Sequence, residues 1–112
     1  MRIAIPLSGE TLSPHFGHCE RFALVDVDPA ECRIVGREDI AAPPHEPGLL
    51  PAWLAQRGAT MIVAGGMGRR AQDLFAQQGI EVLVGVDGGT PEALVTAYLD
   101  GTLKGGQNIC DH

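Results

Sequence analysis

The sequence predicts an α/β protein with a mixed sheet, built in the order βββαβαβα. Short runs rich in Ile, Val and Leu recur between Gly and Pro residues, as buried strands do. The first three runs leave no room for a helix between them. From residue 49 onward such runs alternate with apolar residues at helical spacing, so helices should pack on the sheet. Because 112 residues is the length of one domain, we expect a single domain over 1–112 with a tail at 101–112.

The first three strands are predicted to follow one another closely. Residues 3–7 form the first strand, which Pro6 should help to end before a loop at residues 8–20. The second strand is expected at 22–28 and the third at 32–40. Only a tight turn separates these two strands, so they should pair as a hairpin.

The rest of the chain should alternate helices and strands. Gly58 and Gly79 are placed to end two helices, and Thr90 followed by Pro91 should begin a third. In order, we expect a Pro-rich connection at 41–48, a helix from Leu49, a strand at 60–64, a helix through Phe75, a strand at 80–84 and a helix through Leu99.

Composition and charge narrow the classes of function. The net charge of −6 argues against a non-specific nucleic-acid binder and against an anionic membrane surface as partner. No apolar run approaches the roughly 18 residues of a transmembrane helix, and the start of the chain lacks the apolar length of a secretory signal. The cysteines lack disulfide spacing, which is typical of a reducing compartment. We therefore expect a cytoplasmic protein.

Strand directions predict where a ligand would bind. Each helix carries the chain back across the sheet, so the first, third and later strands should end at one edge. Four connections then share this edge, at 8–20, 41–48, 65–68 and 85–89. Ligands of open α/β sheets bind beyond the carboxyl ends of the strands. Cys32 should lie at the opposite end, whereas a tail of about a dozen residues is long enough to reach the ligand edge.

The densest group of potential metal ligands lies in the first of these loops. His15, His18 and Cys19 are close neighbours in the sequence, and His and Cys bind soft and borderline transition metals. The alternative is that one histidine caps a turn and Cys19 is a small buried hydrophobe. His45, in the Pro-rich connection, either orients a ligand or is a plain loop residue.

Two further segments are candidates for the same edge. Cys110 and His112 resemble a ligand pair, unless the tail is disordered as chain ends usually are. The run Gly65-Gly66-Met67-Gly68 opens a helix, where backbone N–H groups can hold an anion. The alternative is a tight turn that needs positive φ. Met67 is either a soft ligand or a hydrophobe that lines the pocket.

Short motifs occur along the chain as an ordered set, and the set is more informative than any one member. They are Ile3-Ala4-Ile5-Pro6, Ser13-Pro14-His15-Phe16-Gly17, Pro44-His45-Glu46, Ala64-Gly65-Gly66-Met67-Gly68, Gly79-Ile80-Glu81-Val82 and Cys110-Asp111-His112. Over essentially the whole chain this set resembles the dinitrogenase iron–molybdenum cofactor biosynthesis family. That family includes nitrogenase cofactor carriers and a protein that holds a molybdenum–copper sulfide cluster.

The resemblance implies an RNase H-like fold with a five-stranded mixed sheet. It also implies a nitrogenase accessory protein that binds or carries a metal–sulfur cluster, of iron–molybdenum or molybdenum–copper type, without catalysis. His15 matches the family's His-Phe-Gly motif and Met67 its Gly-Gly-Met/Ile-Gly motif, whereas His18 and Cys19 match positions that vary within the family. Cluster-assembly proteins or an ATPase are the implied partners.

Two alternative functions stay open. The first is an interaction or regulatory module of a cluster-assembly system, without bound metal. The second is a nuclease-like enzyme with a two-metal carboxylate site. Asp26 and Asp28 share one face of the second strand, but they are expected far from the glycine loops, which disfavours the nuclease.

Overall fold

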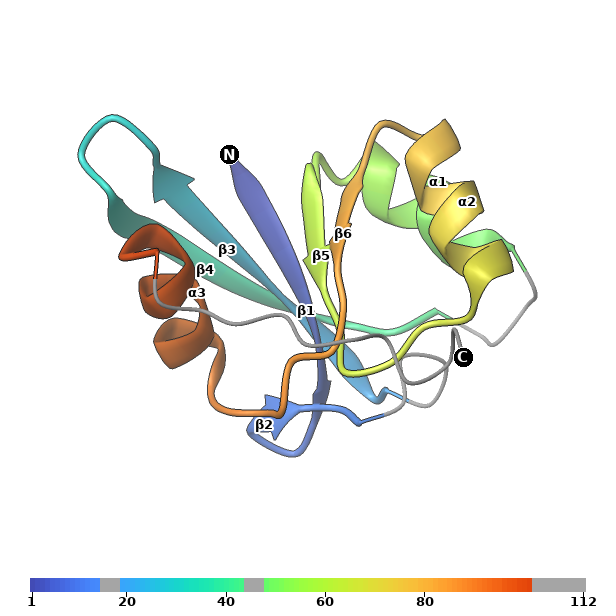
Figure 1. The fold of residues 1–112 in the computed structure, drawn as a ribbon, viewed down its shortest axis with the longest axis horizontal. Coiled ribbons are helices and arrows are strands. Elements are labelled where there is room, and N and C mark those ends of the chain that lie inside the picture. The colour runs from blue at the N-terminus through green and yellow to red at the C-terminus, as the bar shows by residue number, and fades with distance from the viewer. Residues whose placement is uncertain (15–18, 44–47, 102–112) are drawn as a thin grey trace.

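A computed structural model describes residues 1–14, 19–43 and 48–101 of the chain. The predicted order of strands and helices is confirmed, with one short strand added (Figure 1). The elements are β1 (Arg2–Ser8), β2 (Thr11–Leu12), β3 (Arg21–Asp28), β4 (Arg33–Ala41), α1 (Leu49–Gln56), β5 (Met61–Val63), α2 (Arg69–Gln77), β6 (Glu81–Leu83) and α3 (Pro91–Leu99).

The strands form one mixed sheet in the order β4-β3-β1-β5-β6, with β2 paired to β1 outside this path. β1 is antiparallel to β3, and β3 is antiparallel to β4. β5 lies parallel to both β1 and β6. These pairings confirm the predicted mixed sheet and the predicted strand directions.

The predicted count of five strands is wrong, because the structure has a six-stranded sheet. The chain after β1 turns back at Gly9, whose φ is +67°. It then pairs Ser8 with Thr11 and Leu7 with Leu12. Such a strand is too short to show an alternating pattern, so residues 8–20 were expected to be loop throughout.

Pro6 does not end β1, which continues to Ser8. The ring is tolerated because, on the side of β1 away from β3, Pro6 falls between Ala4, the last residue paired with β5, and Leu7, the first residue paired with β2. The Pro6 carbonyl oxygen accepts a hydrogen bond from the Ser13 amide over 2.8 Å. This bond holds the start of the candidate loop against the end of β1.

The sheet is the middle of three layers, with α1 and α2 on one face and α3 on the other (Figure 1). Along β1, Ile3, Ile5 and Leu7 join the α3 side of the core, and Ala4 joins the side of α1 and α2. Strand side chains alternate between the faces, so both faces of β1 are apolar and buried.

Among the helices of the described ranges, none is long and apolar enough to cross a membrane.

The helix ends follow the local sequence as predicted. Gly58 and Gly79 have φ of +83° and +75° directly after the C-caps of α1 and α2, a conformation that glycine adopts without strain. The Thr90 side chain accepts a hydrogen bond from the Ala93 amide over 3.3 Å, and Pro91 is the first residue of α3. This cap fixes where the 85–89 loop enters its helix.

Candidate functional site

Backbone hydrogen bonds join the two glycine loops at the predicted ligand edge. The Gly85 amide donates to the Gly65 carbonyl oxygen over 2.8 Å, and the Val86 amide donates to the Ala64 carbonyl oxygen over 3.3 Å. The Leu12 amide donates to the Gly89 carbonyl oxygen over 2.9 Å. The loops that follow β5 and β6 are therefore tied to each other, and the second of them is tied to β2.

Gly65 packs closely against two other loops. A Cβ built there would lie 3.4 Å from the carbonyl oxygens of both Pro14 and Val86. Its φ lies outside the positive region, and Gly68 has φ −63°, so the positive φ considered for this loop is absent at both positions. Glycines of the other loop do adopt it: Gly85 at +78°, Gly88 at +116° and Gly89 at +126°.

The first loop and the Pro-rich connection also meet at this edge. The Glu20 amide donates to the Leu7 carbonyl oxygen over 2.9 Å, and the Ala42 amide donates to the Glu20 carbonyl oxygen over 3.1 Å. Described residues on both sides of 15–18, and those just before 44–47, are thus fixed to the sheet. Five of the predicted ligands lie outside the described residues and stay predictions: His15, His18, His45, Cys110 and His112.

Cys19 is half-buried and packs against the core beneath α1 and α2. Burial raises the pKa of its thiol to about 11, since a thiolate is poorly solvated there. A thiol ligand binds metal as the thiolate, so ligation by Cys19 must displace a proton that this environment favours. Cys32, by contrast, is exposed in the β3–β4 turn at the far end of the sheet (Figure 1).

Met67 is a core residue, with 2% of its surface exposed. It lies in the same apolar cluster as Phe75 and Phe22, and its carbonyl oxygen accepts a hydrogen bond from Gln72 Nε2 over 2.8 Å. These contacts fit the hydrophobic role considered for Met67. Gly66 is also buried, whereas Gly68 is exposed at the N-cap of α2, where no side chain caps the helix.

A chain of alternating charges connects the β1–β2 turn, the sheet and α3. Arg21 pairs with Glu10 over 2.9 Å and lies 3.6 Å from Asp39. Arg37 pairs with Asp39 over 2.7 Å and also with Glu92 of α3. This network could not be predicted, because its members meet only once the β3–β4 register is set.

Two strand carboxylates, Asp26 and Asp39, are paired with arginines. Asp26 accepts hydrogen bonds from Arg2 Nε over 2.8 Å and Nη2 over 3.1 Å, and this guanidinium lowers the pKa of Asp26. Asp39 is held by Arg37. Across residues 1–14, 19–43 and 48–101, no group of three or more His, Cys, Asp or Glu side chains is placed to hold a metal ion.

Fold and site together define a small three-layer α/β protein whose predicted ligand edge is built from glycine-rich loops. The chain belongs to the dinitrogenase iron-molybdenum cofactor family, whose model matches residues 1–101. The division into a single domain with a tail stays a prediction.

Individual relatives support this assignment. An uncharacterized protein of Methanocaldococcus jannaschii is 37% identical over 87 residues, which cover 73% of this chain and 72% of that protein. The crystal structure of PH0822 matches with a TM-score of 0.85 and 34% identity over 93% of both chains. The apo form of the orange protein from Desulfovibrio gigas matches with a TM-score of 0.73 and 26% identity, over 96% of this chain and 93% of that one.

Proposed function

We propose that this protein binds and carries a metal–sulfur cluster of iron–molybdenum or related type during cofactor assembly in the cytoplasm, and that it is not an enzyme. Family membership supports a role in the handling of such clusters. The RNase H-like relation that the sequence motifs imply is part of this proposal. Cluster-assembly proteins or an ATPase would deliver or receive the cluster.

The observation that carries the proposal is the joining of four connections at one edge of the sheet. Hydrogen bonds link Gly85 to Gly65, Leu12 to Gly89 and Ala42 to Glu20. Together with the Glu20–Leu7 and Ser13–Pro6 bonds, they fix residues on both sides of segment 15–18 and just before segment 44–47. A cluster needs ligands from several segments held at fixed separation, and rigid flanks provide this.

We assign His15 as the principal ligand, because it directly follows Pro14, which packs on Gly65. Imidazole binds iron, copper and zinc readily, and thiolate binds softer centres. Met67 contributes apolar shielding through its buried side chain. Backbone N–H groups of the 65–68 loop would hydrogen-bond an anionic cluster. Further proposed ligands are His18, Cys19, His45, Cys110 and His112.

Ligation by Cys19 and ligation by histidines should give cluster affinities that depend differently on pH. The raised pKa of its thiol means that cluster binding through sulfur would release a proton, so affinity would increase with pH. A cluster held by histidines alone would show little pH dependence above the pKa of imidazole.

Elemental analysis of protein purified anaerobically from its native host tests the proposal. We expect iron, molybdenum or copper together with acid-labile sulfide, in a constant ratio to protein. Protein that carries no metal and no sulfide, yet changes the activity of a cluster-assembly partner, would instead support an interaction or regulatory module.

A further inference from the structure

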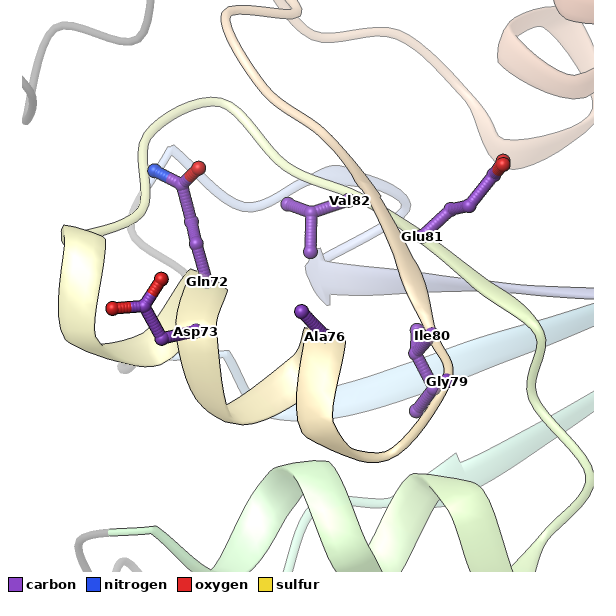
Figure 2. Close-up of a pocket in the computed structure, with 7 residues that line it drawn as sticks. All are labelled: Gln72, Asp73, Ala76, Gly79, Ile80, Glu81 and Val82. Atoms are coloured by element: carbon purple, nitrogen blue, oxygen red, sulfur yellow. The ribbon is translucent and has the colours of Figure 1, made fainter.

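A groove lies between α2 and the outer edge of β6, away from the ligand edge. It encloses about 470 Å³, which is in the range of small-ligand pockets. Figure 2 shows its lining. The lining residues are Gln72, Asp73 and Ala76 of α2, with Gly79, Ile80, Glu81 and Val82 at and before the start of β6.

The backbone of β6 faces this groove with an open hydrogen-bonding edge. β6 is the last strand of the sheet, and within the described ranges it pairs with β5 alone. The Glu81 amide donates to Thr60, and the Leu83 carbonyl oxygen accepts from Ala64, so residues 81 and 83 point toward β5. Backbone groups alternate along a strand, and the N–H and C=O of Val82 therefore point outward. An extended peptide could add a strand here.

The two faces of such an added strand would meet different chemistry. Val82 and Ala76 extend into the space between β6 and α2, with Gln72 and Asp73 at its rim (Figure 2). Glu81 extends away from α2, on the other face (Figure 2). Side chains of a peptide strand alternate between the faces. One set would contact the apolar floor, and the other would lie beside Glu81.

The charges that line the groove indicate whether a second copy of this chain or a basic partner would bind there. The groove residues include two carboxylates, Asp73 and Glu81, and no Lys or Arg. A second copy paired through the same edge would bring Glu81 close to its symmetry mate, and like charges across strands are destabilising. The chain also carries a net charge of −6. A basic partner is therefore favoured over a second copy.

We propose that the β6 edge binds an extended peptide of a partner protein in which basic residues alternate with apolar ones. The apolar side chains enter between Ala76 and Val82, and the basic side chains pair with Glu81. Asp73 attracts a basic group at the rim. The β6 edge lies apart from the proposed cluster site. Peptide binding to this edge can therefore be measured without a bound cluster.

A fluorescein-labelled pentapeptide that alternates lysine and valine tests the proposal with the full-length chain. Fluorescence anisotropy should show saturable binding, and amide NMR shifts should change at Ala76 and Val82. Glu81→Gln and Asp73→Asn should each weaken binding about two- to five-fold, as expected for rim charges. Glu38→Gln removes a charge from the other edge strand, β4, and should leave the affinity unchanged.

Backbone methylation of the peptide provides a second test. Methylating the valine amides or the lysine amides blocks alternate hydrogen bonds, so one form should lose binding and the other should keep it. The proposal is overturned if neither form or both forms lose binding, or if Glu38→Gln weakens binding as much as Glu81→Gln. It is also overturned if a peptide alternating glutamate and valine binds equally well, or if sedimentation shows a dimer that occupies this edge.

Discussion

The Gly85 amide donates a hydrogen bond to the Gly65 carbonyl oxygen over 2.8 Å. This bond joins the loops after β5 and β6 beyond their paired residues. A Cβ on Gly65 would meet carbonyl oxygens of Pro14 and Val86, so the same glycine also lets the first loop approach. Three connections of the ligand edge thus meet at one residue.

Gly65→Ala should destabilise the protein by about 1 kcal/mol, because the added methyl group would lie 3.4 Å from two backbone carbonyl oxygens, at the short limit of ordinary contact. Gly36→Ala is the control. A Cβ at Gly36 meets no heavy atom closer than 3.8 Å, so we expect a change within about 0.5 kcal/mol. Urea denaturation of both variants measures the difference. Equal effects would refute the packing role of Gly65.

Arg37→Met should destabilise the protein by about 1 kcal/mol at low salt, because it removes the ion pairs with Asp39 and Glu92 and so loosens α3 from β4. Salt screens such pairs, so the loss should shrink at 1 M NaCl. The control is Arg33→Met, whose ion pair is with Glu31, two residues away. Thermal unfolding at two salt concentrations makes the comparison, and a salt-independent loss would argue against an ionic role.

Asp26→Asn tests the pairing of Arg2 with Asp26. The folded pKa of Asp26 is lowered by Arg2, so the carboxylate stabilises the fold above its unfolded pKa of about 4. That stabilisation is lost as the pH falls through the lowered folded pKa. Because both side chains are partly exposed, we expect Asp26→Asn to lower the free energy of unfolding by about 0.5–1 kcal/mol at pH 7.

The pH profile carries the sharper expectation for this pair. The difference in free energy of unfolding between wild type and Asp26→Asn, measured by urea denaturation, should be constant above about pH 5 and should shrink below about pH 4. Asp87→Asn, at an exposed position, should show little difference at any pH. A difference that grows as the pH falls would contradict the assignment.

Cys19 should react with iodoacetamide at least about ten-fold more slowly than Cys32 in metal-free protein, because thiolate is the reactive form. Burial raises the pKa of Cys19, whereas Cys32 is exposed. The measurement uses a Cys110→Ser background, with peptide mass spectrometry to locate the label. Equal rates would show that Cys19 is more accessible than its packing indicates.

The order of strands and helices along the chain and the strand directions could be predicted, because the β3–β4 hairpin and the alternating half of the chain each show strong apolar patterns. The strand directions then predicted which connections lie at the same edge of the sheet, and they placed Cys32 at the opposite end. The pairings confirm this arrangement. Helix ends at Gly58, Gly79 and Thr90 were predictable because their local chemistry is sufficient to end or begin a helix.

Features that depend on register or tertiary contact could not be predicted. β2 has two residues and depends on Gly9 and on the neighbouring β1. The pairs of Arg21 and Arg37 depend on the register that places Ala23 opposite Asp39. For Cys19 the sequence left burial and metal ligation open as alternatives, because its burial depends on the core beneath α1 and α2. The roles of His15, His18 and His45 rest on sequence, together with the fixed residues that flank them.

Reconstitution tests the cluster-carrier proposal most directly. Metal-free protein is incubated anaerobically with iron, molybdate or copper plus sulfide and then desalted, and its visible spectrum and metal content are measured. Cys32→Ser, at the opposite end of the sheet, is the control and should match wild type. We predict that wild type retains a visible charge-transfer band with bound metal and that His15→Ala loses most of both. A band and affinity unchanged in His15→Ala would contradict the assignment of His15, and a wild type without band or metal would contradict cluster binding itself.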